Sequence, residues 1–222
     1  MLEEKIYEIY NRIKFSEEVI PLRNISDAGH RSYLKKCTDK VTVDGLWLEF
    51  GVYRGRTICN ISENTNKIVY GFDSFEGLHE HWDSDNPKGI YSLNGRIPEG
   101  AICGEDWEVP YKMRPWPENV KLIQGYFGDT LPQFLVEHTG PIAFLHIDSD
   151  LYSSARYVLD TLAERIVPGT VIVFDEYFNF PGWQQDEFRA WQEFVAKKRI
   201  KYEYLGFVSG HQEVAIKVTK IS

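Results

Sequence analysis

Short apolar runs recur along most of the chain and are separated by segments of helical periodicity. The runs are rich in β-branched, aliphatic and aromatic residues and show no polar alternation, which is typical of strands buried on both faces. They lie at residues 45–50, 67–72, 120–124, 142–147 and 170–174. Strand, helix and strand in succession predict an α/β fold with a doubly wound, mostly parallel sheet. Ligands of such sheets bind beyond the carboxyl ends of the strands.

The segment after the fourth run shows the helical pattern clearly. Asp150 precedes it, and we interpret Asp150 as the helix N-cap, while Pro168-Gly169 ends the pattern. The apolar positions are Ala155, Val158, Leu159 and Leu162. This segment is predicted to be a crossover helix.

The C-terminal part follows a different pattern. Residues 201–208 and 213–218 are predicted strands, and the few residues between them are too short for a parallel crossover, so the two strands should pair antiparallel. Residues 184–197 before them are expected to form a helix. Its apolar residues, which we interpret as core contacts, are Phe188, Trp191, Phe194 and Val195. Residues 2–15 and 26–39 are expected to be two helices that precede the sheet.

One long segment, residues 78–117, fits neither pattern. It is far longer than ordinary loops, which indicates a lid, a binding loop or local disorder. Its aromatic residues favour an ordered cover and are Trp82, Tyr91, Trp107, Tyr111 and Trp116. We expect a lid or a substrate wall, with a purely structural insertion as the alternative.

Composition narrows the class of protein. A chain of 222 residues with 43% hydrophobic content predicts one globular domain, residues 1–222, in which residues 1–43 carry the N-terminal helices. The net charge of −8, without a basic stripe, disfavours nucleic acid as a partner. No apolar run reaches the roughly 18 residues that span a bilayer, and the charged start lacks a signal-peptide core, so we expect a cytoplasmic protein without membrane contact.

The cysteines agree with that compartment. Cys37, Cys59 and Cys103 are odd in number and lack paired ligand spacing. A disulfide framework or a zinc knuckle is therefore not expected, and we interpret the three thiols as reduced.

Glu49 and two glycines follow the first predicted strand in the spacing E-x-G-x-x-x-G. Gly51 permits a tight turn, and Gly55 lets the next helix pack near the strand. A dinucleotide fold would place G-x-G-x-x-G here, whereas this chain has Tyr53 and Arg54 in the gap. The carboxylate of Glu49 suits a ligand with an ammonium or sulfonium group. Glycines placed only for strand–helix packing are the alternative.

Asp73 ends the second predicted strand, 22 residues after Gly51. An acid at this position of a nucleotide-binding α/β unit accepts hydrogen bonds from ribose hydroxyls. The alternative is that Asp73 or Ser74 caps a turn. After the third strand, Tyr126 and Phe127 lie between two glycines, where they could flank an adenine or simply pack.

Carboxylates also end the fourth and fifth predicted strands. Asp148 follows one strand, and Asp175 and Glu176 follow the next. Acids at neighbouring strand ends repel each other unless a cation binds or one takes a proton, and Mg²⁺ suits carboxylate ligands. These three acids are therefore the predicted metal set, with helix capping as the alternative. We interpret His146 as a hydrogen-bonded core histidine, with proton transfer as the less favoured role.

Taken in series, these motifs resemble the macrocin O-methyltransferase family, the metal-dependent sugar-hydroxyl methyltransferases of macrolide biosynthesis. The motifs are LEFGVYRG, GFDSFEGL, QGYFGDTLP, HIDSDLYSSARYVLDTL and VIVFDEYFNFPGWQQ, within residues 45–195. The resemblance implies a Rossmann-like class I methyltransferase fold with an antiparallel C-terminal strand pair. It implies S-adenosylmethionine as cofactor and a bound Mg²⁺ that assists the reaction. The substrate it implies is a hydroxyl of a small metabolite, such as a sugar or another natural product.

The resemblance also implies roles for individual residues. The expected cofactor contacts are Glu49, Gly51, Tyr53, Asp73, Ser74, Phe75, Tyr126, Phe127 and Asp148. The expected Mg²⁺ ligands are Asp148, Asp175 and Glu176, where Glu176 replaces the family's usual second aspartate. The resemblance also suggests Asp148 as the base that takes the proton from the hydroxyl. Apart from the resemblance, we expect His146 as a less favoured base and Trp183, after the fifth strand, as a wall of the acceptor site.

Two other functions stay open at this point. A nicotinamide-dependent oxidoreductase shares the fold class, but neither the glycine spacing of this chain nor its predicted C-terminal strand pair supports that function. A non-catalytic partner protein could keep the cofactor pocket without turnover. A homodimer through the N-terminal helices or the 78–117 segment is a further expectation.

Overall fold

The computed structural model describes residues 27–102, 113–208 and 211–222. The helix predicted at residues 2–15, together with Cys103, Trp107 and Tyr111, lies outside the described residues. Among the described helices, none is both long enough and apolar enough to cross a bilayer. Among the described residues, Cys37 and Cys59 are buried and form no disulfide.

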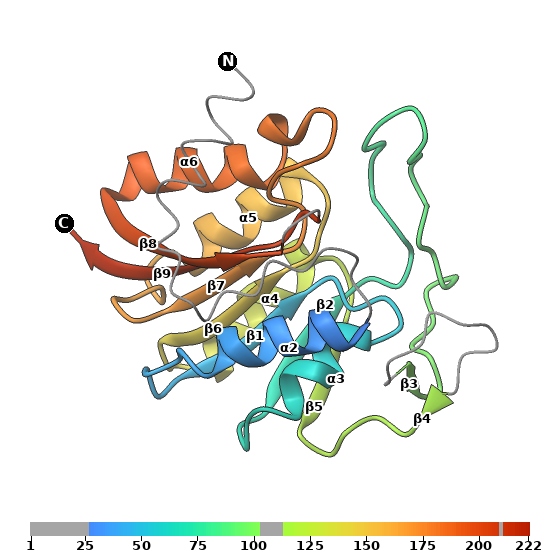
Figure 1. Ribbon diagram of the computed structural model, residues 1–222. Helices are drawn as coiled ribbons and strands as arrows, with labels where there is room; N and C mark the ends of the chain where they lie inside the picture. Colours follow the sequence, from blue (N-terminus) through green and yellow to red (C-terminus); the bar gives the residue numbers. More distant parts are fainter. Residues whose placement is uncertain (1–26, 103–112, 209–210) are drawn as a thin grey trace.

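A seven-stranded sheet forms the centre of the molecule (Figure 1). Its strands are β1 (Leu46–Phe50), β2 (Val69–Asp73), β5 (Val120–Gln124), β6 (Ile142–Ile147), β7 (Val171–Phe174), β8 (Ile200–Phe207) and β9 (Val214–Ile221). The spatial order is β5-β2-β1-β6-β7-β9-β8. The first five strands in this order are parallel, whereas β9 runs antiparallel to both β7 and β8. The predicted doubly wound sheet with an antiparallel C-terminal pair is confirmed.

Helices cover both faces of this sheet (Figure 1). They are α2 (Asp27–Thr38), α3 (Arg56–Ser62), α4 (Phe127–Glu137), α5 (Tyr152–Leu162) and α6 (Glu187–Lys198), with a short 3₁₀ helix η1 (Trp183–Gln185) before α6. Apolar residues of α4, α5 and α6 share one core cluster with the sheet, and those of α2 and α3 share the other. Both faces of the sheet are therefore covered, and a ligand has to bind at the ends of the strands.

Two local predictions were wrong. The strand at 120–124 is not buried on both faces, because β5 is the edge of the sheet and Lys121 and Gln124 are exposed. Asp150 does not cap α5: the N-cap position belongs to Leu151, and no side chain bonds to the end of the helix. Asp150 instead adopts a left-handed conformation, with φ of 60°, which aspartate tolerates better than most residues.

The carboxyl ends of β1 and β6 mark the point where the strand order reverses. The chain runs from β1 outward to β2 and β5, and then returns to β6 and continues through β7 in the other direction. Crevices at such a switch point are where open α/β sheets bind ligands. The loops after β1, β2, β6 and β7 all meet there.

The described part of the 78–117 segment folds back onto these loops. The backbone N–H groups of Leu93 and Gly95 donate to the carbonyl of Phe75, and that of Ile102 donates to the carbonyl of Arg54. A two-stranded sheet, β3 (Ala101–Ile102) with β4 (Met113–Arg114), closes the segment. The ring of Trp116 lies where a side chain at Gly55 would be, so Gly55 packs against the segment. The described part of the segment, residues 78–102 and 113–117, is therefore an ordered cover on the switch point.

Candidate active site

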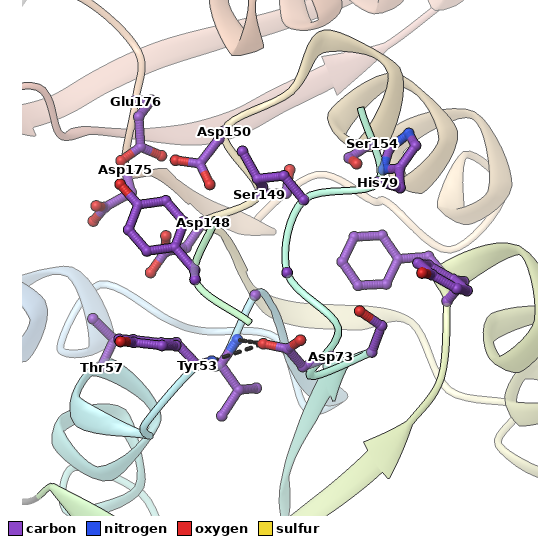
Figure 2. Close-up of a pocket in the computed structure, with 18 of the residues that line it drawn as sticks. Tyr53, Thr57, Asp73, His79, Asp148, Ser149, Asp150, Ser154, Asp175 and Glu176 are labelled. Atoms are coloured by element: carbon purple, nitrogen blue, oxygen red, sulfur yellow. Dashed lines mark hydrogen bonds between the residues drawn. The ribbon is translucent and has the colours of Figure 1, made fainter. Parts of the chain in front are cut away.

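A cavity of about 1000 Å³ opens at the carboxyl ends of the central strands (Figure 2). Several residues predicted from the sequence line it: Gly51, Tyr53, Asp73, Ser74, Tyr126, Phe127, Asp148, Asp175 and Glu176. The remaining predicted residues, Glu49, Phe75 and His146, are not among its lining residues and are buried behind it. The sequence motifs thus meet at one site, where some of their residues line the cavity and the others lie buried behind it.

Gly51 makes the floor of the cavity possible. Its φ is 93°, a conformation that favours glycine, and a Cβ on it would overlap the carbonyl oxygen of Asp148. Two backbone hydrogen bonds hold this junction, from Gly51 to Phe72 at 3.0 Å and from Asp148 to Phe50 at 2.9 Å. The ends of β1, β2 and β6 are therefore in direct contact beneath the cavity.

Asp73 organises the loops beside the cavity. Its Oδ2 accepts hydrogen bonds from the backbone N–H groups of Val52 at 2.8 Å and Tyr53 at 2.7 Å (Figure 2). Its Oδ1 accepts one from the backbone N–H of Phe75 at 2.7 Å. The turn-capping role considered as the alternative is thus present. A carboxylate offers roughly four acceptor positions, so Asp73 keeps capacity for a ligand hydroxyl as well.

Phe75 does not border the cavity with its side chain. It is 1% exposed and belongs to the core cluster under α2 and α3, and its φ of 58° directs the chain into a sharp turn. The prediction that Phe75 contacts adenosine is therefore wrong for its side chain. Trp183 is likewise 1% exposed, packs against Phe188 in the other core cluster, and does not form the predicted acceptor wall.

Asp148 and Asp175 converge as the sequence predicted, and His146 joins them. One ligand atom from each of these three side chains lies within 4.8 Å of the other two. Burial, and then the charge of Asp175, raise the pKa of Asp148 well above its usual value. Crowded buried acids of this kind are stabilised by a cation or by a shared proton.

Asp150 and Glu176 form the adjoining part of the acid cluster. Figure 2 shows their carboxylates turned toward each other, and both residues are buried. Burial and Asp175 raise the pKa of Asp150 to about 7, and burial and Asp175 also raise that of Glu176. Within the described chain, Oε2 of Glu176 is buried without a hydrogen-bond partner. Asp150 is a site residue that the sequence reading assigned to a helix cap.

Glu187 is a second residue that the sequence did not reveal. It is 0% exposed in the first turn of α6, and its two oxygens accept the backbone N–H groups of Ser149 and Glu176, each at 3.2 Å. The loop after β6 and the loop after β7 are therefore held together by one side chain. Its only sequence signal is an acid at the start of a helix, which is too common to be informative.

His146 and Glu49 lie directly behind the acids. Both are 0% exposed, and Nδ1 of His146 is 3.1 Å from Oε2 of Glu49. Burial by itself would lower the pKa of His146, but the carboxylates of Asp175 and Glu49 raise it well above its usual value. The prediction that His146 is a buried, hydrogen-bonded histidine of the core is therefore confirmed.

Tyr91 brings the 78–117 segment into the cavity. It has a φ of 62°, and its ring meets that of Tyr53 edge to face at 5.8 Å between centroids. Burial, followed by the charges of Asp150 and Glu176, raises the pKa of Tyr91 to about 12, so its hydroxyl stays protonated. The other two described aromatics of the predicted set, Trp82 and Trp116, pack elsewhere: Trp82 donates to Asp186, and Trp116 lies on Gly55.

Comparison with known proteins places this site in a wider context. A family model described as macrocin-O-methyltransferase (TylF) matches residues 25–205. A similar protein from Streptomyces olivaceus, 8-demethyl-8-(2,3-dimethoxy-α-L-rhamnosyl)-tetracenomycin-C 4′-O-methyltransferase, is 30% identical over 158 residues, which are 65% of this chain and 58% of that protein. The chain spans about three fifths of the length of the curated relatives that it matches.

Solved structures share the fold. CalS11, a calicheamicin methyltransferase, superposes with a TM-score of 0.59 at 19% identity, covering 85% of this chain and 77% of CalS11. The O-methyltransferase from Bacillus cereus, solved in complex with SAH, gives a TM-score of 0.53 at 19% identity, covering 99% of this chain and 90% of that one. At these identities the likeness concerns the Rossmann-like fold.

Proposed function

The chain belongs to the macrocin O-methyltransferase family, and from that premise we propose that it transfers the methyl group of S-adenosylmethionine to a hydroxyl of a small metabolite. The observation that carries this proposal is the meeting of Asp73 and the acid cluster in one cavity at the switch point. The name of the Streptomyces olivaceus relative supports a sugar, or another natural-product hydroxyl, as the acceptor.

The nucleoside of the cofactor is proposed to bind in the part of the cavity next to the ends of β1 and β2. We propose that Gly51 and Tyr53 lie against the cofactor, that Asp73 accepts from its ribose, and that Ser74, Tyr126 and Phe127 border its adenosine. S-adenosylmethionine supplies a methyl group activated on a positively charged sulfur. The chain's main task is then to align the two reactants and exclude water.

The acid cluster fits a hard divalent ion. Asp148 and Asp175 approach each other, and the buried Oε2 of Glu176 is a polar atom that needs a partner. We propose that Asp148, Asp175 and Glu176 hold Mg²⁺, which prefers a few carboxylates together with water and substrate oxygens. A bound Mg²⁺ would lower the pKa of the acceptor hydroxyl and fix its oxygen.

The acceptor hydroxyl must lose its proton to a nearby group. Asp148 was the expected base, but it is one of the three proposed Mg²⁺ ligands, whereas Asp150 lines the same cavity and is not one of them. We therefore propose that a carboxylate oxygen of Asp150 receives the proton. His146 is not among the lining residues, which argues against a direct proton-transfer role for it.

The 78–117 segment is proposed to be the acceptor wall. Tyr91 lines the cavity next to Tyr53, where the charges of Asp150 and Glu176 act on it. Its hydroxyl keeps its proton and can donate a hydrogen bond to a substrate oxygen. The two rings would exclude water from the reacting hydroxyl.

Isothermal titration calorimetry tests the proposal. S-adenosylhomocysteine is titrated into the protein with Mg²⁺ and, separately, with a chelator, and NADH serves as the control ligand. We expect heat of binding with the nucleoside and none with NADH. Absence of binding to S-adenosylhomocysteine at millimolar concentration would refute the methyltransferase assignment, and turnover that is indifferent to metal would refute only the role of Mg²⁺.

A pair of variants tests the proton acceptor. Asp150→Asn should abolish turnover of any hydroxylated acceptor while leaving the affinity for S-adenosylhomocysteine close to that of the wild type. Asp148→Asn should also lose metal affinity, because it removes a proposed ligand. Normal turnover by Asp150→Asn would show that another group accepts the proton.

A further inference from the structure

Three buried polar side chains connect helix α3 with the acid cluster. Oγ1 of Thr57 donates to Oε1 of Glu49 at 3.0 Å, and Oε2 of the same carboxylate lies 3.1 Å from Nδ1 of His146. Glu49 and His146 are register partners across β1 and β6 and are both 0% exposed. The two oxygens of Glu49 are thus both engaged with protein groups.

The carboxylate fixes the orientation of the histidine ring. A carboxylate accepts hydrogen bonds, so the ring nitrogen that faces it, Nδ1, carries a hydrogen. The other nitrogen, Nε2, then points away from Glu49 and lies 3.8 Å from Oδ1 of Asp175. Within the described chain, Nε2 is buried without a hydrogen-bond partner, so the ring is aimed at the acid cluster alone.

Burying these groups has a cost that a purely structural core would avoid. Polar and charged side chains that leave water destabilise the fold unless they are paired, and apolar residues of similar size serve equally well in packing. In metal sites, residues behind the ligands that hydrogen-bond and orient them are a common arrangement. The line from Thr57 through Glu49 and His146 to Asp175 has this form.

We infer that Glu49 and His146 are positioning residues that hold the Asp175 carboxylate in place for the divalent ion, and that Glu49 does not touch the nucleoside. This inference rests on the proposed function. It changes the role of Glu49 from the cofactor contact implied by the sequence motif to a support of the acid cluster. Asp175 is 14% exposed at the cavity wall, and the fixed ring of His146 limits where its carboxylate can go.

Two substitutions at Glu49 test the inference with two separate readouts. Glu49→Gln keeps an oxygen that can accept from Nδ1, whereas Glu49→Leu removes both acceptors. Binding of Mn²⁺, followed by electron paramagnetic resonance, reports on the acids, and calorimetry with S-adenosylhomocysteine reports on the nucleoside side. We expect the Mn²⁺ affinity to fall about 10- to 100-fold in Glu49→Leu and less in Glu49→Gln, with nucleoside affinity within about threefold of the wild type.

Glu213→Gln is the matched control. Glu213 is another fully buried glutamate that is paired with a histidine, His211, and it also accepts the backbone N–H of Gln212. The control variant should lose thermal stability in the same way as the Glu49 variants but keep its Mn²⁺ affinity. This separates a general folding defect from a defect of the acid cluster.

The possible results each decide a point. Loss of nucleoside affinity in the Glu49 variants with unchanged Mn²⁺ affinity would overturn the inference and return Glu49 to the cofactor. Unchanged affinities for both Mn²⁺ and S-adenosylhomocysteine in the Glu49 variants would overturn the inference and leave Glu49 with a packing role. A wild-type protein that binds the nucleoside but not Mn²⁺ would also overturn it. A wild type that binds Mn²⁺ but not S-adenosylhomocysteine would refute the proposed function, and a graded Glu49 series would still establish the support of the acids.

Discussion

Replacing Gly51 by alanine tests the contact on which the floor of the cavity depends. The added Cβ meets two obstacles: a φ of 93° and the carbonyl oxygen of Asp148. A left-handed conformation costs a residue with a side chain about 1–2 kcal/mol, and forcing an extra carbon into a packed position costs about 1–3 kcal/mol. The sum, about 2–5 kcal/mol, is a large part of the roughly 5–15 kcal/mol that stabilises a typical domain.

Thermal unfolding followed by circular dichroism measures this loss. For a chain of this size each kcal/mol lowers Tm by about 2–4 °C, so Gly51→Ala should unfold about 4–20 °C below the wild type. Its affinity for S-adenosylhomocysteine should also fall, because the backbone of Asp148 has to move away from β1.

Gly89→Ala separates the two contributions. Gly89 has a φ of 83°, but a Cβ built on it has nothing within 4 Å. This variant should therefore show only the conformational cost, with a fall in Tm of about 2–8 °C and unchanged nucleoside affinity. If Gly51→Ala loses no more stability than Gly89→Ala, the close approach of Asp148 to Gly51 does not constrain the site as argued.

Three further predictions concern the acids and the acceptor wall. The raised pKa of Asp150, about 7, means that the folded state holds this proton more tightly than the unfolded state. Its contribution to stability is therefore present below about pH 4 and is lost as the pH rises toward 7. In chelator, Asp150→Asn should match the wild-type Tm at pH 4 and exceed it increasingly up to pH 8; a constant difference would contradict this. Tyr91→Ala should raise KM for the acceptor at least about tenfold, whereas Tyr91→Phe should keep the ring contact and lose less, and S-adenosylhomocysteine affinity should stay unchanged in both. Glu187→Gln should lower the free energy of unfolding in urea by about 1–3 kcal/mol, because the amide nitrogen of glutamine would face one of the two backbone N–H donors, Ser149 or Glu176. An unchanged free energy would show that these two hydrogen bonds do not stabilise the fold.

The strands of the central sheet were predictable because their signal is local and strong. Each apolar run is flanked by polar or turn residues, so β1, β2, β6 and β7 lie within two residues of the predicted ranges. The misassignment of β5 has a physical reason. A run of apolar residues does not reveal whether its strand has neighbours on both sides, because that depends on the order of strands in space.

The acid cluster was only partly predictable for a related reason. Asp148 and Asp175 were found because they follow strands whose ends meet at one edge of the sheet. Asp150 looked like an N-cap because aspartate before a helix usually is one, and only its left-handed backbone turns it toward the cavity instead. Glu187 comes from a helix that is distant in sequence, and no local pattern connects it with the loops that it joins.

The way in which the 78–117 segment is fastened has an evolutionary consequence. Its ties to the loops after β1 and β2 run through backbone groups of Phe75 and Arg54, which every amino acid possesses. Most side chains along the described part of the segment can therefore be exchanged without undoing these bonds, whereas Trp116 is held by the packing of its ring on Gly55. Under the proposed function, selection for a new acceptor can act on this one stretch of chain while the residues proposed to bind the methyl donor stay unchanged.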